Sequence, residues 1–433
     1  MNIIKFSLIT FFLLFYFQTF SQDFRSETPF NRPIITNSDS IKSVQLYKTG
    51  FQQTLPILNL NKSNETIELH FDYLSPNLKN FMYKVVHCDA KWNISDINFY
   101  DYADGLPEDY FINMNSSNNI GLRYVHYDLK LPNQNFSFKI SGNYKLIVYD
   151  EFSLDTILEM GFLVFDTKVQ VESFPKRSSN VELRYAGQEI DFNIKTARYR
   201  LTNPYQDLKV FILQNFRSDN AIEIAPLFVK AEEIEFDYDI ENVFLGGNEF
   251  RPLDLRNLSI NQTIAKMDRS GWISSFSTPS LPKRNFLNYK TLFDLNGRYT
   301  INSQDDFYNA NTNNQYVWVT FTLDQPYLYQ NRKVYVFGEL SNWQYLDDFA
   351  LELNTETNQM EKKILLKQGY YNYQFMVMVP GNFAEPLGNS SWDIEGTHHE
   401  TENEYQILIY HKAPGTYYDA LVGFDYFKFP FRD

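Results

Sequence analysis

The chain has 433 residues and a formal net charge of −14, because 53 acidic side chains outnumber 39 basic ones. This acidic balance argues against nucleic acid as a partner, since phosphate contacts need clustered Lys and Arg. The 39 Phe and 31 Tyr favour pleated, half-buried strands. Cys88 is the single cysteine, so no intramolecular disulfide can form and packed cores must supply the stability.

The first residues have the pattern of an export signal. Lys5 precedes an apolar stretch at 6–17, and small side chains follow at Thr19 and Ser21. This pattern predicts a signal peptide over residues 1–21 with cleavage after Ser21, and a flexible segment over 22–37. An uncleaved anchor is the alternative, but the apolar core is shorter than the about 20 residues of a membrane span. We therefore expect an exported, periplasmic chain.

Alternating apolar residues recur along the rest of the chain and predict an all-β fold. In residues 66–73 and in residues 316–323, apolar side chains stand at every second position, so in a strand they lie on one face. Further predicted strands are, in chain order, Phe81–Cys88, Phe136–Ile140, Tyr144–Tyr149, Glu189–Thr196, Leu208–Gln214, Val334–Gly338, Tyr371–Met378 and Tyr405–Tyr410. Turn residues separate them at short spacing, which is typical of tandem immunoglobulin-like, antiparallel β-sandwich domains.

Two segments indicate domain boundaries. The run from Phe162 to Ser173 indicates one domain's last strand passing almost directly into the next domain's first strand. The stretch 306–315 is polar and Asn-rich, which is typical of a linker or an exposed loop. The sequence thus predicts three sandwiches at 38–166, 167–305 and 306–433. Their short connections predict a stiff rod.

Histidine and cysteine side chains in the first domain invite a metal or nucleophile hypothesis. His87, Cys88 and Asp89 are adjacent, and neighbours in a strand point to opposite faces, so they do not converge on one site. Cys88 is interpreted as a small core residue, and His87 and His126 as partners that hydrogen-bond across the first sandwich. The six histidines have no zinc-site spacing, so we expect neither a metal nor a cofactor.

Carboxylates near the C-terminus could suggest glycoside hydrolysis. Glu400, Glu402 and Glu404 stand at alternate positions, so in a strand they point the same way. A glycoside hydrolase needs two carboxyls that face each other across a substrate. A solvated strand face or a calcium-binding loop is therefore the preferred interpretation.

The Gly246–Gly247 pair is the remaining glycine-rich candidate. It lacks the Lys of a phosphate loop, so it predicts a tight turn that places Arg251 and Asp254 or Arg256 in a salt-bridged loop. No Gly-x-Ser-x-Gly nucleophile elbow occurs in the chain. The sequence therefore predicts no catalytic residue.

Two groups of aromatic residues are candidate contact sites. Trp343 follows Asn342, and its ring is either offered to a partner or sugar, or caps the core beneath the turn. The chain ends in an aromatic run that includes Tyr426, Phe427 and Phe429. Clustered apolar rings pack on the body of the protein or on a partner, and packing on the chain's own domains is the favoured interpretation.

The segment from Val334 to Met378 resembles the glycogen-binding type of immunoglobulin-like module. The matching residues are Val334–Gly338, Leu340–Trp343, Leu351, Met360–Leu366 and Gly369–Phe375. In sugar-binding members an aromatic ring at the position of Trp343 stacks on a glucan, and a second Trp follows the last strand. Here Phe383 stands near that second position, with no Trp aligned. The resemblance implies the fold and makes carbohydrate an alternative ligand.

Segments spread over almost the whole mature length are similar, in order, to the plug protein family of the type IX secretion system. They are Tyr83–Asp89, Trp92–Ser95, Tyr124–Tyr127, Ser141–Tyr144, Gly246–Arg251 and Glu400–Tyr405. The resemblance implies a periplasmic protein that is peripheral to the outer membrane through its partner, a very large translocon barrel. It also implies that the protein closes the barrel's periplasmic mouth while no substrate is in transit.

The leading hypothesis from the sequence is therefore a non-enzymatic plug of the type IX translocon. The alternative is a periplasmic or surface carbohydrate-binding protein, which depends on the Trp343 region. A glycoside-active enzyme ranks last, because the sequence offers no pair of opposed carboxylates.

Overall fold

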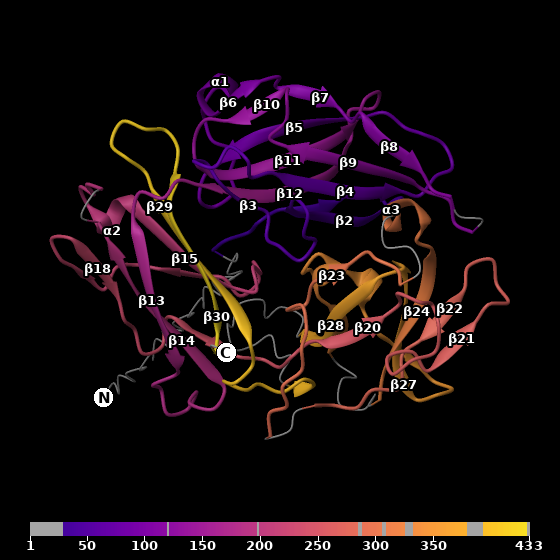
Figure 1. Ribbon diagram of the computed structural model, residues 1–433. Helices are drawn as coiled ribbons and strands as arrows, with labels where there is room; N and C mark the ends of the chain where they lie inside the picture. The colour runs from indigo at the N-terminus through magenta and orange to yellow at the C-terminus, as the bar shows by residue number, and fades with distance from the viewer. Residues whose placement is uncertain are drawn as a thin grey trace, which may run out of the picture.

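The computed structural model describes residues 29–118, 121–196, 199–284, 288–304, 309–324, 332–378 and 393–430. These residues form antiparallel sheets packed into three β-sandwiches, which confirms the predicted all-β class (Figure 1). The predicted signal peptide and residues 22–28 lie outside the described part of the chain. Within the ranges given, no helix is long and apolar enough to cross a membrane.

The first sandwich packs a six-stranded sheet against a four-stranded one. The larger sheet contains β1 (Ile34–Thr36), β12 (Thr156–Phe165), β11 (Gly142–Asp150), β5 (Phe81–Cys88) and β7 (Glu108–Tyr110), with β3 (Ile57–Asn59) parallel to β12. The smaller contains β2 (Ile41–Lys48), β4 (Ile67–Tyr73), β9 (Val125–Leu131) and β8 (Asn113–Ser116). A short helix and a strand pair accompany them, α1 (Phe99–Tyr102), β6 (Ala103–Gly105) and β10 (Phe136–Phe138).

Alternation along β4 explains why this strand lies where it does. Ile67, Leu69 and Phe71 are almost fully buried in the first core, as the period-two pattern predicts. The ring of Phe71 stacks on that of Tyr127 from β9, with 5.0 Å between centroids. Cross-strand aromatic pairs of this kind fix the register of neighbouring strands.

The second sandwich is completed by the C-terminal strands. One sheet contains β13 (Gln170–Arg177), β14 (Gly187–Lys195), β18 (Glu233–Phe236), β17 (Phe228–Val229) and β19 (Val243–Leu245). The other contains β16 (Ile222–Ile224), β15 (Leu208–Gln214), β29 (Asn403–His411) and β30 (Ala420–Phe429), and α2 (Pro204–Asp207) precedes β15. Tyr405, Ile407 and Ile409 of β29 fill this core, so residues 403–429 belong to the second sandwich.

The third sandwich lies between β19 and β29 in the chain. Its first sheet contains β20 (Arg251–Asp254), β28 (Tyr370–Met378), β23 (Tyr299–Thr300) and β25 (Lys333–Phe337). Its second contains β21 (Lys266–Asp268), β22 (Ser275–Ser277), β24 (Tyr316–Leu323), β27 (Gln359–Lys367) and β26 (Glu352–Asn354). Among the described residues, the short turns of helix that join these strands are α3 (Ala310–Asn313), η2 (Glu339–Ser341) and η3 (Asp347–Phe349).

The domain division differs from the one expected at residues 305 and 306. The chain leaves the second sandwich at Gly246–Gly247 and returns to it near His398, so the third sandwich is an insertion. The two crossings are bonded together, because the carbonyl of Gly247 accepts the backbone N–H of His398 at 2.9 Å and the hydroxyl of Thr401 at 2.8 Å. A Cβ on Gly246 would lie 2.0 Å from the carbonyl oxygen of His398, so glycine is required there.

The predicted rod is wrong, because each sandwich contacts both of the others. The first sandwich lies across the second and third, which stand beneath it (Figure 1). A shared apolar cluster that includes Leu163, Phe211 and Leu408 joins the first sandwich to the second. Ion pairs join the third sandwich to the first and to the second, Lys367 with Asp72 and Arg298 with Glu404. Short connections therefore fold the chain back on itself.

Candidate functional site

Trp343 lies at the meeting point of the three sandwiches. Its ring is 8% exposed and contacts the edges of Phe250 and Phe337, with centroids 6.0 and 5.7 Å away. It belongs to the core cluster of the first sandwich, and the guanidinium of Arg217 from the second sandwich lies 5.5 Å from its ring centroid. The core-capping interpretation of Trp343 matches this position. A stacked sugar needs an open ring face, which the buried ring does not offer.

The remaining aromatic candidates divide between the core and the surface. Phe427 stacks on Tyr405 with 5.6 Å between centroids, and Phe429 packs against the second core, so both are held by the chain's own domain. Tyr426 points outward and is 43% exposed. Asn342 is half-buried and adopts a left-handed conformation that ends η2. Phe383 lies outside the described residues.

Cys88 is a core residue, as predicted. It is fully buried in the apolar cluster between the first and second sandwiches, and burial raises the pKa of its thiol to about 12. His87 points the other way and is held by the Ser95 hydroxyl at 2.8 Å and the Ser141 carbonyl at 3.3 Å. Burial lowers the pKa of His87 to about 4, so the ring is neutral at pH 7.

The expected bond between His87 and His126 is wrong. His126 bonds instead through Nδ1 to Asp72 at 2.7 Å and through Nε2 to His70 at 3.1 Å. Both of its ring nitrogens are therefore engaged on β4, the neighbouring strand of its own sheet. The two histidines lie at different junctions. His87 contacts the ring of Tyr418 from the second sandwich, whereas His126 bonds to Asp72.

Asp72 is the centre of the junction between the first and third sandwiches. Its carboxylate is fully buried and accepts hydrogen bonds from Lys367 at 2.6 Å, Tyr316 at 2.7 Å and His126 at 2.7 Å. Burial alone would raise the pKa of Asp72, but the Lys367 ammonium and the His126 bond hold it below its usual value. The Lys367 ammonium also lies 4.2 Å from the ring centroid of Tyr124 and donates to the carbonyl of Asn311.

A second buried ion pair joins the third sandwich to the second. Arg298 makes two 2.8 Å bonds to the carboxylate of Glu404, which is 2% exposed. Burial opposes the charge of Glu404, but the guanidinium holds its pKa below the usual value. The expectation of a solvated carboxylate face is therefore wrong at Glu404. Glu402 is half-buried beside Lys428 and Glu400 is exposed, so the three carboxylates do not act as a set.

Glu395 marks the return crossing from the third sandwich. Arg251 bonds to it at 2.9 Å and Arg284 at 2.7 Å, and together they hold its pKa down against the effect of complete burial. The sequence predicted a salt-bridged loop after Gly246–Gly247. The Arg256–Asp254 ion pair is present at 2.6 Å, but Arg251 and Asp254 lie in β20 and not in a loop, and Arg251 turns inward to the distant Glu395.

Asp294 is a buried carboxyl whose pKa is raised toward neutrality. Burial raises its pKa to about 7, and nearby Glu249 adds to the rise. Groups with such a pKa are common at active sites. Here one oxygen accepts the backbone N–H of Phe250 and the other that of Asn296 at 2.7 Å. Asp294 therefore ties down the turn before β23, and its oxygens are occupied by the protein's own backbone.

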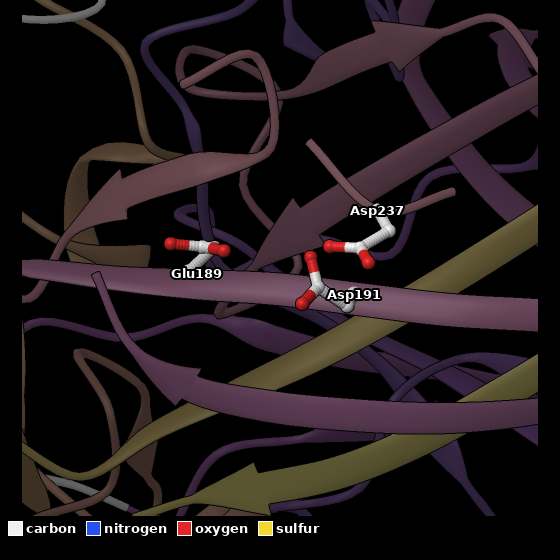
Figure 2. Close-up of side chains that lie close together, drawn as sticks. All are labelled: Glu189, Asp191 and Asp237. Atoms are coloured by element: carbon white, nitrogen blue, oxygen red, sulfur yellow. The ribbon is translucent and has the colours of Figure 1, made fainter. Parts of the chain in front are cut away.

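One group of three described carboxylates is close enough to hold a metal ion. Glu189 and Asp191 on β14 and Asp237 after β18 point toward one another, with oxygens within 4.8 Å of each other (Figure 2). The ammonium of Lys176 lies 3.0 Å from Glu189, 2.5 Å from Asp191 and 3.8 Å from Asp237. The lysine thus supplies the positive charge, and the cluster is an ion-pair network across β13 and β14.

Comparison with known proteins assigns the first sandwich. Residues 41–166 match the family described as type 9 secretion system plug protein 1st domain. The first sandwich is therefore similar to a plug-protein first domain. The match confirms the resemblance to the plug family and associates the chain with type 9 secretion. None of the curated proteins compared with the chain matches it.

The similarity to a solved structure extends beyond the plug-protein first domain. A crystal structure of a hypothetical protein from Parabacteroides merdae has a TM-score of 0.86 and 29% sequence identity, covering 92% of this chain and 99% of that one. The arrangement of all three sandwiches is therefore shared with that protein. Trypsin-activated alpha-2-macroglobulin from Escherichia coli aligns with a TM-score of only 0.17 and carries no structural argument.

The residues that join the plug-protein first domain to its neighbours were missed by sequence reasoning. Asp72 and Lys367 stand at positions of β4 and β27 that alternation assigns to the outward faces. From the sequence alone, a polar residue on the outward face of a strand is expected to contact water. Here the outward faces of β4 and β27 are packed against each other. The available signal was a charged residue flanked by aromatic ones in the sequence, since Asp72 stands between Phe71 and Tyr73.

Replacing Lys367 by Met should strongly destabilise the protein. The substitution leaves the fully buried carboxylate of Asp72 without its counter-ion, which typically costs about 3–5 kcal/mol. Urea denaturation at pH 7 measures the loss as a fall in the unfolding midpoint. Lys333→Met is the control, because the Lys333–Asp347 pair at 2.7 Å is exposed and its loss should leave the midpoint in place. Equal midpoints for both variants would contradict the role given to Lys367.

Trp343 should contribute to stability and not to sugar binding. Trp343→Ala removes a buried ring and is expected to cost about 3–5 kcal/mol. Addition of maltoheptaose should leave the tryptophan emission of the wild-type protein unchanged. A saturable change in emission that Trp343→Phe abolishes would show instead that the ring binds glycan.

Proposed function

We propose that the chain is a non-enzymatic plug that binds and seals the periplasmic opening of the type IX secretion outer-membrane translocon. The observation that carries this proposal is the match of residues 41–166 to the plug-protein first domain. In this proposal the partner is a very large outer-membrane barrel. The chain works in the periplasm, at the inner face of the outer membrane, and is held there through that partner.

The three-sandwich body has properties that suit a plug. An open protein-sized pore would leak, so its cover must be bulky and must keep its shape under load. Buried ion pairs between sandwiches support such a shape, because any relative sliding would separate charges in a medium of low dielectric constant. An interface of about 1,200–2,000 Å² is enough for specific contact and still permits release.

The proposal needs no catalysis by this chain. The buried carboxylates Asp72, Glu395 and Glu404 are each neutralised by Lys or Arg from a distant part of the sequence. Such groups hold elements together, since their oxygens already accept hydrogen bonds from the protein. The carbohydrate-binding alternative lacks comparable support because the Trp343 ring is buried.

Affinity purification from envelope membranes tests the proposed function. The tagged chain, extracted with a mild detergent, is expected to bring down one very large outer-membrane barrel protein in stoichiometric amount. A tagged periplasmic protein of similar size and charge serves as the control for non-specific capture. Recovery of the tagged chain alone would contradict the proposal.

A further inference from the structure

Loops at one end of the first sandwich carry a group of exposed apolar side chains. They are Leu78 before β5, Tyr110 and Ile112 at the end of β7, and Phe152 and Leu154 between β11 and β12. Phe152 is 84% exposed and Ile112 83%. We call these five residues the loop-tip cluster. Exposed apolar groups gathered in one place mark interaction sites in soluble proteins.

Hydrogen bonds connect the three loops of the loop-tip cluster. The hydroxyl of Tyr110 donates to the carboxylate of Glu151 at 3.2 Å, and the amide of Asn80 donates to the same carboxylate at 3.0 Å. Lys79 pairs with Asp150 at 2.6 Å, which binds the loop before β5 to the end of β11. The tips are therefore held in position before any partner arrives, which lowers the entropy cost of binding.

The loop-tip cluster lies at the end of the first sandwich opposite its junction with the second. Strand β11 begins beside the second sandwich, where the side chain of Asn143 accepts the hydroxyl of Tyr410 at 2.6 Å. It ends at Asp150, and β12 starts back from the same end at Thr156. Strand β7 lies at the upper edge of the first sandwich, away from the two sandwiches below (Figure 1). Among the described residues, none of these five side chains takes part in the hydrogen bonds or ion pairs that join the sandwiches.

Charge around the loop-tip cluster restricts the kind of partner. Residues 74–80, 106–112 and 150–155 contain five carboxylates and one lysine, a formal net charge of −4. An anionic lipid surface would repel this rim, since membranes attract clusters of Lys and Arg. A protein surface with an apolar centre and a rim of Lys and Arg is complementary in both respects.

We propose that the loop-tip cluster is the surface with which the chain docks on its protein partner, an apolar patch bordered by basic side chains. The inference rests on the proposed function and places the contact with the translocon on the plug-protein first domain. Phe152 and Ile112 are the central anchors, because large side chains that become fully buried dominate binding energy. The acidic rim steers the approach and sets the orientation.

Two matched triple variants test the docking surface in the full-length protein. Ile112→Ser, Phe152→Ser and Leu154→Ser together remove most of the apolar surface, and recovery of the barrel is expected to fall about tenfold or more. The control combines Tyr205→Ser, Phe228→Ser and Ile240→Ser, which are 57%, 57% and 59% exposed on the second sandwich. The control should recover the barrel at the wild-type level, and both triples should keep the wild-type unfolding midpoint.

A charge variant tests the basic rim without changing the apolar side chains. Asp155 is exposed in the loop between β11 and β12, so Asp155→Lys should fold normally and weaken recovery of the barrel. Unchanged recovery with Asp155→Lys would contradict a basic rim on the partner.

The outcomes separate this inference from the proposed function. If the wild-type chain recovers the barrel and the Ile112, Phe152 and Leu154 triple recovers it equally well, the docking surface is wrong and the plug function stands. If the wild-type chain recovers no barrel, the plug function itself fails. Binding of the wild type, but not the triple, to phosphatidylglycerol vesicles would overturn the inference in favour of lipid. A wild-type dimer that the triple dissociates would overturn it in favour of a second copy.

Discussion

The arrangement of this protein depends on one buried carboxylate and the groups that neutralise it. Asp72 has no exposed surface, and it is stable in that position because Lys367, Tyr316 and His126 bond to it from two sandwiches. Removing a charge from water costs several kcal/mol, so the contact is favourable only when every partner is in place. The junction therefore stabilises one relative position of the first and third sandwiches, and any shift from that position raises the free energy.

The other two junctions depend on different groups. Arg298 and Glu404 fix the third sandwich to the second, while a largely apolar cluster containing Cys88 joins the second to the first. The inserted third sandwich is attached by two chain crossings that are hydrogen-bonded to each other at Gly247 and His398. A domain that is attached by two chain crossings and two buried ion pairs cannot rotate freely relative to its neighbours. The whole molecule then keeps one shape, which is what the proposed plug function requires.

The sequence predicted local structure well because alternation is a local signal. Strands β4 and β24, the buried Cys88 and the all-β class follow from which side chains face a core. The partners of those strands were not predictable in the same way. The pattern of β29 says that the strand is buried, but it does not say that the strand belongs with β30 to a sandwich whose remaining strands lie some 160 to 230 residues earlier. Lys367 shows the same limit, because an outward lysine looks solvated until a second domain covers it.

Distances between nitroxide labels test directly whether the three sandwiches keep one arrangement. Tyr100, Tyr205 and Leu353 are exposed on the first, second and third sandwiches, and cysteines placed there can be labelled while the buried Cys88 stays unreactive. Pulsed electron resonance on the pairs Tyr100→Cys with Leu353→Cys, and Tyr205→Cys with Leu353→Cys, should give one narrow distance population for each pair. Broad or multiple populations would contradict a single rigid body and remove the structural basis of the proposed plug function.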